Sequence, residues 1–213
     1  DVVSPEDVEQ LAASGRFVAL SEMMNVPGVV YKDKDVIAKL QIASQHHLPI
    51  DGHSPRLSGD NLHTYVSYGI NTDHECLSSD EAEEKVAAGM KILIREGSAA
   101  RNYEALKPLI AKHPDMVMFC TDDAHPDDII ERGHIDKLVR MAVADGFDLF
   151  DVLHIASTAA IEHYKLDVGH LQIGDKADFI VVNDLKSFRT DSVFIDGVKQ
   201  YDRTDCQMSE KHA

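Results

Sequence analysis

The feature that most constrains the fold is an alternation of short apolar runs with longer amphipathic stretches. The apolar runs begin near residues 17, 48, 70, 90 and 116, and stretches with helical spacing follow them. Strands that alternate with helices favour βα units, in which parallel strands are covered by helices. The pattern therefore predicts an α/β fold with about five βα units over residues 1–165, including a first strand at 17–20 and one continuous helix at 98–112.

A closed (β/α)8 barrel contains eight such units, so five predict a partial (β/α)8 TIM barrel. After residue 165 the sequence changes to short strands punctuated by glycine, at 177–183 and 192–197. Residues 166–202 are therefore predicted to form strands of a small β domain. Residues 203–213 show no clear pattern and are expected to form a loose tail.

The chain does not begin with methionine, which suggests that it starts inside a longer polypeptide. An incomplete barrel would leave strand edges unpaired and apolar helix faces uncovered. We therefore expect the chain to form a homo-oligomer, to be complemented by a missing N-terminal segment, or to be inactive alone.

Charge and cysteine content exclude several classes of partner. The chain has 37 acidic against 21 basic residues, a formal charge of -16, and such a surface repels phosphate backbones and anionic lipids. Nucleic acid and membrane partners are therefore not expected. Three widely spaced cysteines favour neither a disulfide framework nor a thiolate zinc site, and with no long apolar run they indicate a cytoplasmic protein.

Potential metal ligands follow four of the five predicted strands. These are Glu22, His53, His74 with Glu75, and Asp122 with Asp123, whereas the remaining strand ends in Arg95-Glu96. In a βα barrel the carboxyl ends of the strands meet on one face, where the active site is built. Imidazoles mixed with carboxylates suit zinc, iron or manganese better than magnesium or calcium. The sequence therefore predicts a divalent transition-metal site at the strand ends.

Five histidines lie elsewhere in predicted helices and loops, where histidines are more often surface or packed groups than ligands. They are His125, His134, His154, His163 and His170. Of these, His125 and His134 are the stronger candidates, because their segment follows the fifth strand and should lie beside the site.

Several local motifs resemble adenine deaminases of the bacterial, two-metal type, within the amidohydrolase superfamily. The motifs are Ser21-Glu22-Met23-Met24-Asn25, Asp51-Gly52-His53-Ser54-Pro55, Asp73-His74-Glu75-Cys76, Ile94-Arg95-Glu96-Gly97-Ser98 and Cys120-Thr121-Asp122-Asp123. The likeness extends from about residue 17 to residue 201. It implies that the chain is the C-terminal two thirds of such a protein, with the C-terminal part of its barrel.

The resemblance also implies roles for individual residues. Glu22 would stand where many amidohydrolases carry a metal-bridging carbamylated lysine, and His53 and His74 would ligate one metal. Asp122 would complete the metal site and accept a proton. Two metals per complete site are implied, as manganese, iron or zinc.

The implied reaction is hydrolytic deamination of adenine to hypoxanthine and ammonia, a purine salvage activity. Glu75 would shuttle a proton to ring nitrogen N1 and to the leaving ammonia. Asp123 would bind the purine N7 edge, and Glu96 and Ser98 would line the substrate pocket.

The sequence also departs from the family pattern. It contains no His-x-His pair, which the family carries on its first strand, and it has Ala124 and Arg56 where the family usually has a basic residue and glycine. Two alternatives therefore stay open. One is another amidohydrolase that acts on a cyclic amide or a different amino-purine, and the other is a truncated, non-catalytic metal-binding protein.

Overall fold

Five parallel strands form in the predicted order. The computed structural model describes residues 3–205, and the strands are β1 (Leu20–Met23), β2 (Ile50–Gly52), β3 (Thr72–Asp73), β4 (Lys91–Arg95) and β5 (Val117–Cys120). β1 pairs with β2, and β4 pairs with both β3 and β5. A parallel bridge from Ile50 to Ile70 joins the two groups, so successive strands are neighbours throughout.

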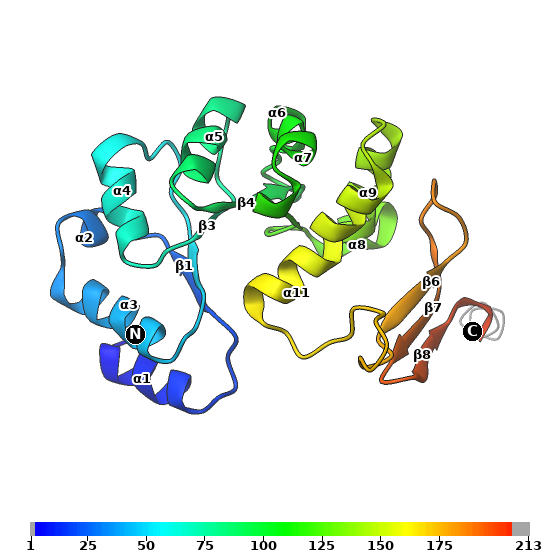
Figure 1. Cartoon of the computed structure of the whole chain (residues 1–213), viewed down its shortest axis with the longest axis horizontal. Coiled ribbons are helices and arrows are strands. Elements are labelled where there is room, and N and C mark those ends of the chain that lie inside the picture. Colours follow the sequence, from blue (N-terminus) through cyan, green and yellow to red (C-terminus); the bar gives the residue numbers. More distant parts are fainter. Residues whose placement is uncertain (1–2, 206–213) are drawn as a thin grey trace.

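Helices precede and follow these strands. They are α1 (Pro5–Ala13), α2 (Val26–Val30), α3 (Lys34–Gln45), α4 (Gly59–Ser67), α5 (Ser79–Ala87), α6 (Tyr103–Leu106), α7 (Pro108–Lys112), α8 (Pro126–Arg132), α9 (Ile135–Ala144), α10 (Leu149–Leu153) and α11 (Ala159–Tyr164). Figure 1 shows α4, α5, α6, α7 and α9 as an outer row, with the strands on the inner side. No helix within residues 3–205 is both long enough and apolar enough to cross a bilayer.

Side-chain caps fix where several helices begin. Ser4 accepts a hydrogen bond from the Asp7 N–H while Asp7 binds the Ser4 N–H, which completes a capping box at α1. Asp33 caps α3 and Ser78 caps α5, each through a side-chain oxygen that accepts backbone N–H groups of the first turn. Each cap satisfies a backbone N–H group of the first turn that has no partner within its helix.

Two apolar clusters hold the helices against the strands. One packs α3 and α4 on the first strands and includes Leu40, Ile50, Leu62, Tyr65 and Ile70. The other surrounds β4 and β5 and includes Ile92, Ile94, Leu106, Val117 and Leu138. Because the helix-facing side chains of the strands are buried in these clusters, the residues at the strand ends are held on a fixed framework.

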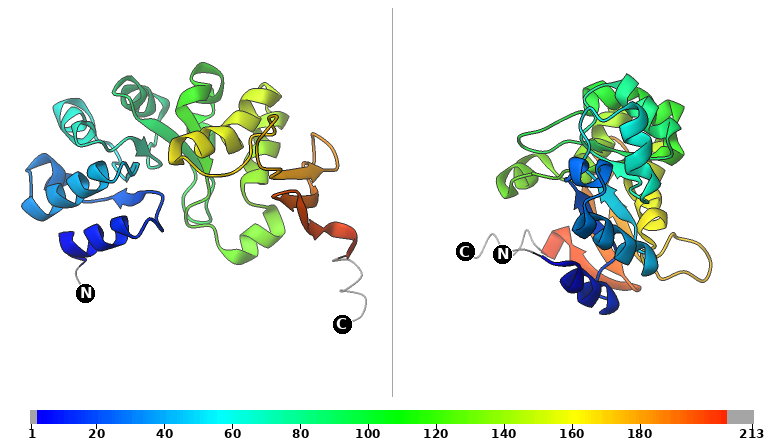
Figure 2. Two further views of the ribbon diagram at one scale, coloured as in Figure 1. Left: turned by 60° about the horizontal axis from the view of Figure 1, so that its bottom comes forward. Right: turned by 90° about the vertical axis from the view of Figure 1, so that its left-hand side faces the viewer.

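The segment after α11 forms a separate antiparallel sheet. It consists of β6 (Phe179–Val182), β7 (Thr190–Ile195) and β8 (Val198–Asp202), in that order. Figure 2 shows this sheet at the end of the molecule opposite α1. The strands expected at 177–183 and 192–197 are thus present, and most of the expected loose tail lies outside the described residues.

The first strand was predicted three residues too early. The expected strand at 17–20 is replaced by β1 at 20–23, because pairing with β2 begins only at Leu20 opposite Ile50. Phe17 and Val18 remain 48% and 56% exposed, so their apolar character does not reflect strand burial. As a result Glu22 lies within β1 and not after it.

The prediction of a single helix at 98–112 was also wrong. Residues 98–102 form an irregular loop, with a bridge between Glu96 and Arg101, and two short helices follow. The break between α6 and α7 falls at Lys107, directly before Pro108, whose nitrogen cannot donate a helical hydrogen bond.

Gly52 lies where β2 passes closest to β3, so a side chain there should disturb the sheet. A Cβ at this position would lie 2.3 Å from the Thr72 carbonyl oxygen and 2.9 Å from Ile70 Cγ2. We expect Gly52→Ala to lower the free energy of unfolding in urea by about 3 kcal/mol, because backbone must move to admit the methyl group.

Gly59→Ala is the matched control, because its Cβ would meet no atom within 4 Å. Its left-handed backbone should cost only about 1 kcal/mol. Equal losses in the two variants would contradict the close approach at Gly52.

Candidate metal centre and active site

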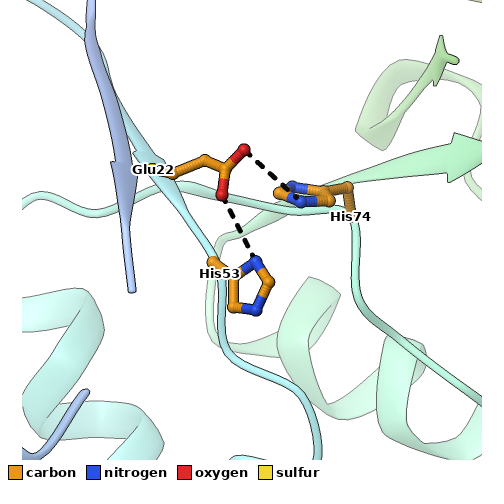
Figure 3. A group of neighbouring side chains, drawn as sticks. All are labelled: Glu22, His53 and His74. Carbon is orange, nitrogen blue, oxygen red and sulfur yellow. Dashed lines mark ion pairs between the residues drawn. The ribbon is translucent and has the colours of Figure 1, made fainter. Parts of the chain in front are cut away.

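Glu22, His53 and His74 converge from three neighbouring strands. Glu22 comes from β1, His53 follows β2 and His74 follows β3. Their ligand atoms all lie within 4.8 Å of one another, and Figure 3 shows the carboxylate facing both imidazoles. His53 Nδ1 lies 3.4 Å from Glu22 Oε2, and His74 Nε2 lies 3.9 Å from Glu22 Oε1.

The chemistry of this group fits a divalent transition metal. His53 Nδ1 is buried and has no hydrogen-bond partner, although buried polar atoms usually have one. The 3.4 Å approach to Glu22 Oε2 does not have hydrogen-bond geometry. A cation between these atoms would take the imidazole lone pairs and the carboxylate charge together. Glu22, His53 and His74 are therefore the residues that could hold a metal.

A second group shares His74 and adds two carboxylates. His74 Nε2 lies 3.4 Å from Glu75 Oε1 and 3.9 Å from Asp122 Oδ2, and all three offer ligand atoms within 4.8 Å. Arg95, at the end of β4, donates to both carboxylates. Asp122 follows β5 with a left-handed backbone, φ 45°, which is uncommon outside glycine and recurs at functional sites.

Asp123, Glu96 and Ser98 lie beside these two groups and do not join them. Asp123 Oδ2 accepts the Ala99 N–H at 3.0 Å, and its Oδ1 is buried without a hydrogen-bond partner. Glu96 is buried and pairs with Lys137 at 2.9 Å. The Ser98 hydroxyl accepts the His125 N–H at 2.8 Å and donates to Asp128.

A third group of possible ligands, Asp73, Cys76 and Glu81, already contains a cation. The Lys85 ammonium lies 3.0 Å from Asp73 Oδ2 and 2.8 Å from Glu81 Oε1. Burial alone would raise the pKa of Asp73, but Lys85 and the Ser54 N–H outweigh it and hold that pKa below its usual range. Burial also raises the pKa of the Cys76 thiol, which therefore stays protonated. This group is an internal ion pair and not a metal site.

The five histidines set aside in the sequence lie outside these groups. His134 Nε2 shares a hydrogen bond with the Thr121 hydroxyl at 2.8 Å. His154 approaches Asp115 at 3.6 Å, and burial lowers the pKa of His163. None of the five histidines set aside in the sequence belongs to a ligand group among residues 3–205.

Sequence reasoning missed four buried side chains that contact the strand ends. Tyr65, Lys85 and Asn102 were not singled out, and Arg95 was noted only as the end of a strand. Each bonds to residues at least seven positions away. The available signals were weak, because a lysine in an amphipathic helix ordinarily indicates a solvated face.

Parallel strands that carry candidate imidazole and carboxylate ligands at their carboxyl ends are typical of βα-barrel hydrolases that use divalent metals. Within that class, the chain belongs to the amidohydrolase family, whose pattern it matches over residues 2–199.

Relatives similar to this chain in sequence are named adenine deaminase. The protein from Sulfurovum sp. is 53% identical over 195 residues, which cover 92% of this chain and 36% of the relative. Those from Methanosarcina mazei and Salinibacter ruber are 53% and 49% identical, over 35% and 36% of their lengths. The chain thus spans about a third of these relatives, and the two thirds inferred from the motifs was wrong.

Solved structures agree in fold at low sequence identity. A β-aspartyl dipeptidase from Fervidobacterium islandicum superimposes with a TM-score of 0.69 at 16% identity, over 92% of this chain and 60% of that one. A 5-methylcytosine deaminase from Klebsiella pneumoniae gives a TM-score of 0.61 at 14% identity, over 93% and 59%. These likenesses support the α/β architecture.

Proposed function

We propose that this chain supplies much of the catalytic site of an adenine deaminase, which hydrolyses adenine to hypoxanthine and ammonia. The observation that carries the proposal is the convergence of Glu22, His53 and His74 in a chain about 50% identical to proteins of that name. We further propose that residues 1–165 are part of a (β/α)8 barrel and that residues 166–202 contribute to a small β domain.

The metal ligands are proposed to be Glu22, His53, His74 and Asp122. A bound divalent cation would supply one kind of chemistry, namely lowering the pKa of a water to about 7 so that it can attack carbon at neutral pH. Manganese, iron and zinc all suit this donor set, and two metals per complete site are proposed. The four side chains would orient the water toward C6 of the purine.

Asp122 and Glu75 are proposed to move the protons. In the net reaction one water adds at C6, the C6–N bond breaks, and ammonia leaves. Asp122 would accept a proton from the attacking water, and Glu75 would carry a proton to N1 and to the departing amine. Arg95 donates to both carboxylates, which supports placing these two proton-transfer groups side by side at this end of the sheet.

Asp123, Glu96 and Ser98 are proposed to border the purine. Asp123 Oδ1 has no hydrogen-bond partner among the described residues, and the purine N7 edge would supply one. Glu96 and Ser98 would shape the pocket through their segment between β4 and α6. A cytoplasmic location and an assembled or complemented active form remain predictions.

The deciding assay is metal-dependent formation of hypoxanthine from adenine. Activity should disappear after chelation and return with Mn²⁺, Fe²⁺ or Zn²⁺, because the attacking water needs the cation. Cytosine, guanine and a hydantoin are the comparison substrates. Faster turnover of any of these would favour another amidohydrolase activity. A catalytic site needs at least one equivalent of bound metal, so less than about half an equivalent would favour a non-catalytic protein.

A further inference from the structure

A buried tyrosine joins the end of β1 to the end of β2. Tyr65, on α4, is fully buried, and its hydroxyl donates to the Met23 carbonyl oxygen at 2.5 Å. The same hydroxyl accepts the His53 N–H at 3.1 Å. Because Met23 follows Glu22, this one oxygen ties the backbone beside Glu22 to the backbone of His53.

A buried ion pair joins the end of β2 to the end of β3. The Lys85 ammonium uses its three donors on the Ser54 carbonyl at 2.6 Å and on the carboxylates of Asp73 and Glu81. Asp73 in turn accepts the Ser54 N–H at 2.7 Å and the Ser54 hydroxyl at 2.9 Å. Ser54 follows His53, and Asp73 precedes His74, so the pair clamps the two imidazole-bearing loops together.

A buried amide joins the end of β3 to the end of β4. Asn102 Oδ1 accepts the Arg95 N–H at 2.7 Å. Its Nδ2 donates to the carbonyl oxygens of His74 at 3.1 Å and Cys76 at 3.2 Å. Each gap between successive strand ends, from β1 to β4, is thus closed by a buried polar side chain.

We propose that Tyr65, the Asp73 and Lys85 pair, and Asn102 are positioning residues that hold Glu22, His53 and His74 at metal-binding spacing. This inference rests on the proposed metal site. Ligand bonds to zinc are only about 2.0 to 2.2 Å long, so small shifts of a loop matter. Groups that orient metal ligands typically change metal affinity by about 10 to 100-fold when altered.

Tyr65→Phe tests the first link, with Tyr103→Phe as the matched control. Both tyrosines are fully or almost fully buried, and the Tyr103 hydroxyl bonds Asp145 at 3.0 Å, away from the strand ends. Zinc affinity is measured in the full chain by competition with a chelating dye. We expect Tyr65→Phe to weaken zinc binding by about tenfold and Tyr103→Phe by less than about threefold, at similar thermal midpoints. Equal losses would overturn the inference, because the effect would then follow stability alone.

Asp73→Asn tests the second link with a readout that needs neither metal nor substrate. Amide hydrogen exchange in residues 51–55 and 72–76 should accelerate by about tenfold or more, while exchange in β5 should stay within about threefold of the unaltered chain. Unchanged exchange at the two loops would overturn the inference. If Asp73→Asn does not fold, Ser54→Ala, which removes one hydrogen bond and keeps the ion pair, decides by the same measurement.

The outcomes separate this inference from the proposed reaction. If the chain binds zinc and the variants behave as expected but no hypoxanthine forms, only the adenine deaminase proposal fails. If the unaltered chain binds no zinc, the metal site is wrong and the inference falls with it.

Discussion

Replacing His74 with alanine is expected to abolish tight zinc binding and to lower the proposed adenine deaminase activity by at least about 10⁴-fold. His74 has the largest expected effect because its Nε2 faces Glu22, Glu75 and Asp122, so it belongs to both ligand groups. Without the cation, water keeps its ordinary, far higher pKa and is ionised roughly 10⁸-fold less at neutral pH than a water of pKa near 7.

Bound metal and hypoxanthine formation are measured together on the same preparation. His63→Ala is the control, because His63 is an exposed residue of α4 outside the ligand groups and should leave both quantities within about twofold of the unaltered protein. Full metal content in His74→Ala would show that the site lies elsewhere.

Replacing Lys85 with methionine is expected to lower the free energy of unfolding by about 3 to 5 kcal/mol. Methionine fills much the same volume but removes the ammonium that faces the Asp73 and Glu81 carboxylates, and Asp73 would remain buried. Breaking a buried ion pair from one side carries a penalty of this size because the remaining charge is uncompensated.

Urea unfolding measures the loss, and Lys107→Met is the matched control. Lys107 pairs with Asp145 at 3.0 Å, but both side chains are about a third exposed. Such a pair contributes no more than about 1 kcal/mol. The double variant Lys85→Met with Asp73→Asn should recover part of the loss, because it leaves a smaller uncompensated charge. A loss no larger than that of Lys107→Met would contradict the role of Lys85.

The strand pattern allowed much of the fold to be predicted, and the errors have identifiable causes. All five parallel strands were anticipated, since apolar periodicity reports burial against helices. The first was displaced because Phe17 and Val18 are apolar yet exposed, and exposure depends on which strand lies alongside. The helix predicted at 98–112 does not form as one helix, because of the bridge at Arg101 and because of Pro108. The helical spacing of the apolar residues did not reveal either interruption.

For the site, the sequence predicted that Glu22, His53 and His74 would meet, and the structure brings them together. Their roles as ligands stay predictions, as do those of Asp122, Glu75, Asp123, Glu96 and Ser98. The contact of Arg95 with two of the carboxylates was not foreseen. The sequence can place a side chain at the carboxyl end of a strand. Which residue that side chain contacts depends on its rotamer and on the paths of the loops.

The amino-acid sequence by itself determined which residues stand at the carboxyl ends of the strands, because parallel strands bring those ends to one edge. Only the tertiary structure decided which side chains connect the neighbouring strand ends along that edge. Tyr65 and Lys85 read as ordinary helix residues, and their bonds to Met23 and Ser54 cross 42 and 31 positions of the chain. A buried hydroxyl or ammonium is stable only where folding supplies its hydrogen-bond partners. The roles of Tyr65 and Lys85 can therefore be recognised only in the folded structure.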